Sequence, residues 1–232
     1  MSEFLNPKLN SPFYFARKGL YKAALSFSKH VNGGRLLDFG CGSKTYRSLM
    51  TVDEYIGLDF DNEGHPHDEE QIDIFYDRGA LPFENKSFDY ILCTEVFEHL
   101  FDIDDKLLEF NRILKDKGLM FVTCPFVWNE HEIPYDYARY TSFALNDKFQ
   151  KSGFEVISYQ KGGTFIETYT QAFFLYFSKK ETKFKSDQIG FFKKSVIFSI
   201  NLFGNIMNRI LPNNDSLYLS NIYVVKKVDE KL

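Results

Sequence analysis

The segment RLLDFGCGSKTY, residues 35–46, joins an apolar run to a glycine-rich turn. The run ends in Asp38, and Gly40 and Gly42 then flank Cys41. Because glycine has no Cβ, the backbone can turn sharply here and come close to a ligand. The pattern predicts a buried strand that leads directly into a ligand-binding turn.

Short apolar runs bounded by Gly, Asp or Pro recur along the chain and predict further buried strands. These runs lie at 36–39, 55–58, 72–76, 90–93, 119–124, 154–159 and 218–225. Apolar residues at helical spacing predict helices at 11–30, 103–115 and 142–151. Parallel strands need crossover connections, so this alternation predicts an α/β fold: a doubly wound, mainly parallel sheet with helices on both faces.

A chain of 232 residues fits a single domain. We expect it to begin with the helix at 11–30 and to carry a helical, Phe-rich insertion at about 164–212, before the last strand. The second helix of the insertion, 190–211, has an apolar face. That face could pack on its own domain or on a twin subunit in a homodimer. It could also act as a lid or make a peripheral membrane contact, which nearby Lys and Arg residues favour.

Composition excludes several classes of protein. The net charge is -4 and no long basic run is present, so nucleic acid is not an expected partner. The N-terminus lacks a secretory signal, and the apolar stretch 195–211 is interrupted by polar residues, so we expect a cytoplasmic protein with no transmembrane segment. The cysteines have no metal-ligand spacing and HPHDEE, residues 65–70, is typical of a solvated loop, so no metal site is expected.

The residues that follow the predicted strands suggest the ligand. In an open parallel sheet, ligands bind outside the carboxyl ends of the strands. Asp59 ends the second strand, where a carboxylate can accept hydrogen bonds from two ribose hydroxyls, so together with the glycine turn it indicates a nucleoside. Thr45 stands where the dinucleotide fingerprint has its third glycine, which counts against NAD, and the spacing of a P-loop is absent.

Four segments in order, LLDFGCG, YIGLD, LPFENKSFDYILCTEVFEHL and RILKDKGLMFVTCP, resemble the successive motifs of the class I S-adenosylmethionine-dependent methyltransferases of the small-molecule type. The similarity covers roughly residues 36–126. It implies a Rossmann-like, seven-stranded sheet whose last strand is antiparallel. It also implies S-adenosylmethionine as the methyl donor and S-adenosylhomocysteine as the product.

Carried over motif by motif, the resemblance implies a set of cofactor contacts. Asp38, Gly40 and Gly42, with Cys41 between them, would surround the methionine portion; we expect the Cys41 side chain to be a small apolar filler. Asp59 would bind the ribose and Phe60 would lie beside the adenine.

Further along the chain, Asp77 would accept a hydrogen bond from the adenine amino group, with Asp73 as the alternative, and the backbone of Arg78 would face a ring nitrogen. Thr94 and Glu95 would border the sulfonium and the amino-acid end.

The segment CPFVWNEHEIPYDYARYT, residues 124–141, is dense in aromatic and ionisable side chains, which predicts a lining of the acceptor site. The residues expected to bind substrate are Trp128, His131, Tyr135, Arg139 and Tyr140. If the acceptor is a hydroxyl, His131 is the candidate general base, and Asp136 or His99 could orient it or replace it. The alternative is structural: Asp136 pairs with Arg139, His131 is a loop residue, and Glu98 and His99 form a helix-surface pair.

The sequence therefore favours an enzyme that transfers a methyl group to an oxygen or nitrogen of a small-molecule acceptor, with a sugar or glycan precursor as one candidate. Two alternatives stay open. One is a nucleoside-binding scaffold that has lost catalysis and acts through its helical insertion. The other is an NAD-dependent oxidoreductase, against which Thr45 counts.

Overall fold

The computed structural model describes residues 4–60, 71–77, 79–177 and 190–229. They group into two compact units, each described here by itself. The helical unit comprises Met1–Ala23, Phe126–Asn129 and Lys161–Ser220, and the sheet unit comprises Ala24–Pro125, Glu130–Gln160 and Asn221–Leu232. A single domain over the whole chain therefore stays a prediction.

The sheet has seven strands in the order β3-β2-β1-β4-β5-β7-β6. Their bounds are β1 Arg35–Phe39, β2 Glu54–Phe60, β3 Ile74–Tyr76, β4 Phe88–Thr94, β5 Leu114–Pro125, β6 Phe154–Gly162 and β7 Ser220–Lys227. Strands β1 to β5 pair in parallel, and β1 lies between β2 and β4. The strand order therefore reverses at β1 and β4, beside the glycine-rich turn, which is where such sheets bind ligands.

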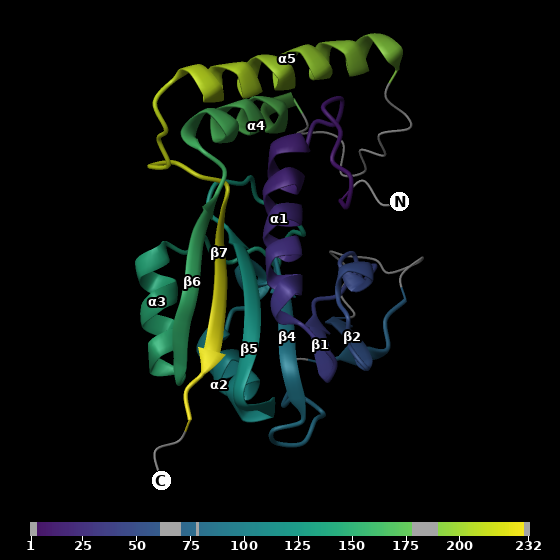
Figure 1. Ribbon diagram of the computed structural model, residues 1–232, viewed down its shortest axis with the longest axis vertical. Coiled ribbons are helices and arrows are strands. Elements are labelled where there is room, and N and C mark those ends of the chain that lie inside the picture. Colours follow the sequence, from purple (N-terminus) through teal and green to yellow (C-terminus); the bar gives the residue numbers. More distant parts are fainter. Residues whose placement is uncertain (1–3, 61–70, 78, 178–189, 230–232) are drawn as a thin grey trace. The chain divides into compact units, whose positions relative to one another are not determined.

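Strand β7 runs antiparallel to β6, as its arrow in Figure 1 shows. The amide of Leu219, just before β7, donates to the carbonyl of Gly162 at the end of β6. At the other end, the amide of Val228 donates to the carbonyl of Gly153, which precedes β6. The seven-stranded, mainly parallel sheet with an antiparallel last strand is thus confirmed.

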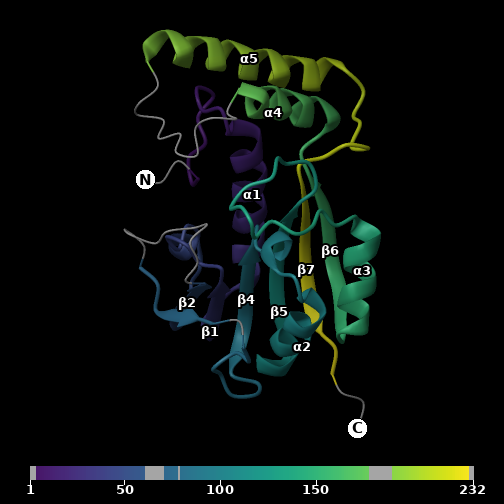
Figure 2. The same ribbon diagram turned by 180° about the vertical axis from the view of Figure 1, so that it is seen from behind.

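The strands alternate their side chains between two helical layers. Leu37, Phe39, Ile91 and Val122 belong to a buried cluster with side chains of α2 (Ile103–Ile113) and α3 (Ser142–Lys151). These two helices cover the face that Figure 2 shows in front. On the other face Phe27, at the end of α1 (Tyr14–Phe27), stacks on Phe121 of β5 with ring centroids 5.1 Å apart.

Most predicted elements form within a few residues of their expected bounds. Helix α1 is shorter than predicted, and β5 begins earlier than predicted. Helix α1 begins at Tyr14 and ends at Phe27, inside the predicted range 11–30. Helix α2 ends at Ile113 and β5 begins at Leu114, earlier than the predicted strand at 119–124. The apolar stripe at 103–115 runs from the helix into the strand, so helical spacing alone does not mark the boundary.

The helical unit contains α4 (Phe165–Phe177) and α5 (Phe191–Ile210), which lie side by side in Figures 1 and 2. Helix α5 matches the predicted range 190–211 to within one residue at each end, and α4 lies inside the predicted helical insertion at about 164–212. Gly204 of α5 permits a close approach, because a Cβ there would lie 2.8 Å from the hydroxyl of Thr170 on α4. No helix among the described residues combines the length and apolar character needed to cross a membrane.

Candidate active site

The turn after β1 needs glycine at its first position. Gly40 has a φ of 72°, and a Cβ on it would lie 2.3 Å from Cγ2 of Val96. Its amide and that of Cys41 both donate to the carbonyl of Leu58, at 2.8 and 3.1 Å. Gly42 also has a positive φ, of 46°. Packing against Val96, two residues after β4, and hydrogen bonding to β2 thus fix the path of the turn.

Asp59 connects β2 to this turn. Its Oδ2 accepts a hydrogen bond from the amide of Gly42 at 2.6 Å, and its Oδ1 accepts one from the amide of Phe60 at 2.7 Å. The side chain is buried. Asp59 and the glycine turn, which the sequence analysis assigned to one ligand, are therefore in direct contact.

Asp38 lies inside the sheet next to the same turn. Tyr55 donates its hydroxyl to Oδ2 of Asp38 at 2.5 Å. Burial raises the pKa of Asp38 to about 7, in spite of the hydrogen bond from Tyr55, which lowers it. Burial likewise raises the pKa of the Cys41 thiol, which fits its expected role as an apolar filler.

The two candidate adenine contacts are placed differently. Asp77 is exposed beyond the end of β3, and its Oδ1 accepts a hydrogen bond from Gly79 at 3.3 Å. Asp73 precedes β3 and binds the ammonium of Lys44 and the amide of Gly57, both at 2.7 Å. Arg78 lies outside the described residues, as does the HPHDEE segment.

A cavity of about 510 Å³ opens in the sheet unit. Phe60 and Tyr76, whose rings meet edge to face with centroids 5.1 Å apart, form one wall. The full lining is Phe60, Tyr76, Gly79, Ala80, His99, Leu100, Phe101, Asp102, Asp105, Lys106, Leu108, Glu109, Glu132 and Tyr135. Its size and its mixture of aromatic and polar groups suit a nucleoside-sized ligand.

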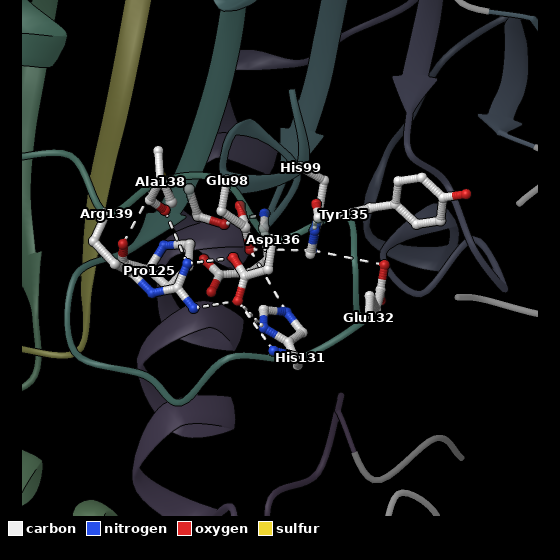
Figure 3. A network of polar contacts seen from close by, with 12 residues as sticks. Glu98, His99, Pro125, His131, Glu132, Tyr135, Asp136, Ala138 and Arg139 are labelled. Atoms are coloured by element: carbon white, nitrogen blue, oxygen red, sulfur yellow. Dashed lines mark hydrogen bonds and ion pairs between the residues drawn. The ribbon is translucent and has the colours of Figure 1, made fainter. Parts of the chain in front are cut away.

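The loop after β5 is organised around Asp136, as Figure 3 shows. Its two carboxylate oxygens accept hydrogen bonds from both terminal nitrogens of Arg139, at 2.5 and 2.7 Å. Oδ2 also accepts from the backbone amide of His131 at 3.0 Å and lies 3.1 Å from the ring Nδ1 of His131. The predicted structural pair of Asp136 and Arg139 therefore exists, and it holds His131 as well.

Glu98 and His99 turn inward from the short 3₁₀ turn Phe97–His99. The Glu98 side chain is fully buried, and its backbone carbonyl accepts from the amide of Tyr137 at 2.7 Å. Nδ1 of His99 lies 2.8 Å from the carbonyl oxygen of Tyr135. Glu98 and His99 are thus not a helix-surface pair but meet the loop that carries His131.

Burial controls the charges of this cluster. It raises the pKa of Glu98 well above its ordinary value, and the nearby Glu95 raises it further. Burial, with His99 next to it, lowers the pKa of His131. Burial also raises the pKa of Asp136, but the hydrogen bonds from Arg139 and His131 outweigh it and leave the pKa below its usual range. The lowered pKa of His131 therefore favours its neutral imidazole, and the lowered pKa of Asp136 favours the ionised carboxylate opposite Arg139.

A model of the methyltransferase domain family matches residues 13–159, more than half of the chain. The chain belongs to this methyltransferase domain family. The recognition made from the ordered motifs is thereby confirmed: the protein is a class I methyltransferase, and its cofactor is S-adenosylmethionine.

Solved structures with the same fold include a SAM-dependent methyltransferase from Archaeoglobus fulgidus, at 18% identity, 97% coverage of both chains and a TM-score of 0.55. The [4+2]-cyclase SpnF has 14% identity, with 97% of this chain and 86% of that chain covered and a TM-score of 0.57. Phosphoethanolamine N-methyltransferase 2 from Haemonchus contortus, solved with S-adenosyl-L-methionine, has 15% identity and a TM-score of 0.52. The match covers 98% of this chain and 60% of that chain. At such identities the likeness shows the fold alone. A search of curated proteins finds no match to this methyltransferase.

The remaining predicted site residues of the methyltransferase divide between the two units. Tyr135 lines the cavity, and Tyr140 is half-buried against the core, where burial raises the pKa of its hydroxyl to about 12. Glu95 follows β4 with a φ of 55°, and its amide donates to the carbonyl of Thr123. Trp128 belongs to the helical unit, where its ring centroid is 6.1 Å from that of Phe13. Its role at the acceptor stays a prediction.

Of the residues that line the cavity of the methyltransferase, only Phe60, His99 and Tyr135 were predicted from the sequence, and three of those not predicted make notable contacts. Tyr76 ends β3, and Lys106 of α2 donates hydrogen bonds to the Tyr76 hydroxyl and to the carbonyl of Gly79. Glu132 reaches His99, with its Oε2 3.7 Å from Nε2. A lysine on the inner stripe of a helix is a signal for Lys106, whereas nothing in the spacing of Tyr76 or Glu132 distinguishes them.

Proposed function

We propose that the chain transfers the methyl group of S-adenosylmethionine to an oxygen or nitrogen of a small molecule whose polar group meets His99 and His131. The observation that carries this proposal is the extent of the cavity. Its lining includes Phe60 and Tyr76, at the carboxyl ends of β2 and β3, and also His99, Glu132 and Tyr135. A single space therefore borders both the expected adenine position and His99, which lies next to His131.

The proposed cofactor contacts follow the motifs. Asp38, Gly40, Cys41 and Gly42 hold the methionine portion, and Asp59 holds the ribose. The close packing of Gly40 on Val96 supports this assignment, because a side chain there would fill the turn. Phe60, whose ring meets that of Tyr76 edge to face, is proposed to provide the apolar contact for adenine. Thr94 and Glu95 border the sulfonium end, and Asp77 and the backbone of Arg78 stay the proposed polar adenine contacts.

S-adenosylmethionine supplies an activated methyl group on a sulfonium, so the chain has mainly to align the acceptor and exclude water. An acceptor hydroxyl must also lose its proton. His131 is the proposed general base, and His99 and Asp136 support it. Nδ1 of His131 faces the ionised Asp136 and Nδ1 of His99 faces a carbonyl oxygen, so both Nδ1 atoms donate and both Nε2 atoms keep a lone pair toward the cluster.

A polyhydroxylated acceptor, such as a sugar or glycan precursor, is the proposed substrate class. Each hydroxyl both donates and accepts, and the lining of the cavity offers partners of both kinds. Glu132 and Asp102 accept hydrogen bonds, and the Lys106 ammonium donates them. Arg139, Tyr135 and Tyr140 are proposed to position the acceptor from the loop.

Calorimetric titration with S-adenosylhomocysteine and a methyl-transfer assay with radiolabelled S-adenosylmethionine test the proposal separately. We expect saturable product binding, and labelling of members of a panel of sugars and sugar nucleotides. Binding of S-adenosylhomocysteine without transfer to any sugar, alcohol, carboxylic acid or amine would instead favour the scaffold alternative. A panel in which only thiol or carbon acceptors are labelled would contradict the assignment to oxygen or nitrogen.

A further inference from the structure

Glu98, His99 and His131 direct their ligating atoms toward one point in the sheet unit. Oε1 of Glu98 lies 3.7 Å from Nε2 of His99 and 3.9 Å from Nε2 of His131. The three ligating atoms all lie within 4.8 Å of one another. Figure 3 shows Glu98, His99 and His131 gathered in one network, and the two imidazoles meet edge to face with centroids 4.8 Å apart. Residues from two separate segments of the chain thus converge on a small polar centre.

Both carboxylate oxygens of Glu98 are buried without a hydrogen-bond partner among the described residues. A buried, unsatisfied carboxylate is costly, since it has lost its hydration and gained nothing in exchange. The two nearest polar groups do not solve this problem, because each imidazole presents Nε2 to Glu98. Their Nδ1 atoms face oxygen acceptors: the carbonyl of Tyr135 and the carboxylate of Asp136.

This arrangement is the one in which histidines bind metal ions. A ligating imidazole usually donates its second N–H to a carbonyl or carboxylate, which fixes the tautomer and aims the other nitrogen at the ion. His99 and His131 each satisfy that condition, and they do so with different acceptors. Without an ion, the raised pKa of Glu98 lets its carboxyl keep a proton that only one imidazole lone pair can accept. A cation between the two imidazoles and the carboxylate would take the place of that proton and satisfy all three ligand atoms.

The spacing also suits an ion. Ligands about 2.1 Å from a tetrahedral ion lie roughly 3.4 Å apart. The two separations from Glu98 exceed this value by only a few tenths of an ångström, and the two imidazole nitrogens lie within 4.8 Å of each other, so rotation of the imidazoles would have to bring them closer. Mixed nitrogen and oxygen ligands favour Zn²⁺, Mn²⁺ or a similar transition metal over Ca²⁺. Three protein ligands leave positions open for an acceptor oxygen.

We propose that Glu98, His99 and His131 bind a divalent transition-metal ion, and that the acceptor hydroxyl coordinates this ion. The role in catalysis rests on the proposed function, whereas the ion binding does not. A bound hydroxyl has a lowered pKa and gives up its proton to solvent. The resulting oxygen forms a bond to the methyl carbon as the bond from that carbon to sulfur breaks. The ion would then activate the acceptor in place of His131 acting as a base. An ion at this position would also overturn the expectation, drawn from the sequence, that the chain has no metal site.

Titration of the chelator-treated full chain with MnCl₂, followed by electron paramagnetic resonance, tests the site directly. We expect one bound ion per chain, with nitrogen couplings from imidazole and displacement by ZnCl₂. Glu98→Gln and His131→Asn are each expected to weaken Mn²⁺ binding by more than about tenfold. His30→Asn, at an exposed histidine of the same unit, is the matched control and is expected to bind like the wild type.

Binding of S-adenosylhomocysteine by each variant shows whether the fold and the cofactor site are intact. Absence of Mn²⁺ and Zn²⁺ binding to the wild type, or equal binding by all folded variants, would overturn the proposed site. Failure of the proposed function looks different: ion binding would persist without methyl transfer. Methyl transfer that a chelator leaves unchanged would overturn the role of the ion in catalysis.

Helix α5 turns polar residues toward its own unit and apolar residues away from it. Asn201 is fully buried, and its amide donates to the carbonyls of Leu9 and Ser11 at 2.7 and 2.9 Å. Asn208 accepts a hydrogen bond from the Thr164 hydroxyl at 2.6 Å. The exposed apolar side chains of α5 are Phe191, Phe192, Val196, Phe198, Leu202, Phe203, Ile206 and Ile210. These eight residues are called the outer face of α5 below.

Helix α4 of the same unit also carries exposed aromatic side chains, Phe173, Tyr176 and Phe177. An exposed apolar surface of this kind marks an interaction site. Its charges favour an anionic partner, because α5 carries Lys193, Lys194 and Arg209 and no acidic residue. Pairing α5 with a second copy would bring these basic groups together, whether the two helices ran parallel or antiparallel.

We infer that the outer face of α5 binds the surface of an anionic membrane, with the phenylalanines in the headgroup region and the lysines on acidic lipids. Co-sedimentation with vesicles of equimolar phosphatidylglycerol and phosphatidylcholine tests the inference. We expect the wild type to sediment with these vesicles and much less with pure phosphatidylcholine. The double variant Phe192→Ser, Phe203→Ser is expected to lose more than about tenfold in vesicle affinity.

Phe143→Ser is the matched control, since Phe143 is 83% exposed but lies on α3. It is expected to bind vesicles like the wild type. Absence of binding to the anionic vesicles, or equal losses in both variants, would overturn the membrane assignment. A dimer in analytical ultracentrifugation that only the double variant dissociates would assign the outer face to a second copy of the chain instead.

Discussion

Asp59 holds the glycine-rich turn in place through a 2.6 Å hydrogen bond from the amide of Gly42 to its Oδ2. The carboxylate proposed to bind the ribose is thus also the group that organises the backbone proposed to surround the methionine. One side chain at the end of β2 links two parts of the proposed cofactor site. A change at Asp59 should therefore affect cofactor binding more strongly than the loss of a single ligand contact.

We expect Asp59→Asn to weaken S-adenosylhomocysteine binding by tenfold to several hundredfold, since hydrogen bonds to a charged group contribute about 1.5–3 kcal/mol each. Calorimetric titration measures the change. Asp53→Asn is a close control, because Asp53 also accepts a 2.6 Å hydrogen bond from a glycine amide, that of Gly34, but it precedes β2. Equal effects at the two positions would mean that Asp59 acts on the fold and not on the ligand.

Gly40→Ala and Gly19→Ala should change stability in opposite directions. At Gly40 the positive φ and the 2.3 Å approach to Val96 strain any Cβ, so we expect a loss of about 2–4 kcal/mol in the free energy of unfolding. At Gly19, inside α1, a Cβ meets no atom within 4 Å, and alanine should add about 0.5–1 kcal/mol. Urea denaturation measures both. A tolerated alanine at Gly40 would contradict the described turn.

The strands could be predicted because buried parallel strands are short apolar runs with turn residues at both ends. The polar residue at the end of each apolar run then marked the carboxyl end of the strand, and Asp38 and Asp59 are two such residues. The boundary between α2 and β5 could not be predicted, because Leu114 fits the apolar stripe of the helix as well as it fits the strand.

Side-chain direction was the part that local sequence could not predict. In EVFEHL, the spacing allows Glu98 and His99 to face solvent or the cavity. The choice depends on the loop after β5, whose amide at Tyr137 donates to the Glu98 carbonyl. On α5, periodicity identified an apolar face but not the side on which it lies. Hydrogen bonds from Asn201 to the distant N-terminal segment turn that face outward.

Asp38 should make stability depend on pH in an unusual direction. Burial raises its pKa from 3.8 to about 7, so between these values the folded chain binds more protons at this position than the unfolded chain. The contribution of Asp38 to the free energy of unfolding is therefore largest below about pH 4, falls as pH rises toward 7 and then levels off. Subtracting the stability of Asp38→Asn from that of the wild type, by urea denaturation from pH 4 to 8, isolates this effect. A difference that does not change with pH would contradict it.

Asp136 is expected to support both the fold of the loop and methyl transfer. Its buried carboxylate pairs with Arg139 through two hydrogen bonds and also holds His131, so Asp136→Asn leaves Arg139 without its charge partner. Breaking a buried pair from one side costs about 3–5 kcal/mol. Because Arg139 keeps some exposure, we expect a loss of about 2–3 kcal/mol in the free energy of unfolding.

The same variant should reduce methyl transfer while S-adenosylhomocysteine binding stays close to that of the wild type, because the loop belongs to the proposed acceptor end of the cavity. Asp147→Asn removes a surface pair with Lys151 at a similar N–O distance, 2.7 Å, and should cost less than about 1 kcal/mol. Chemical denaturation and product calorimetry on the two variants separate the effects. A parallel loss of cofactor binding in Asp136→Asn would place Asp136 in the cofactor site and contradict its assignment to the acceptor loop.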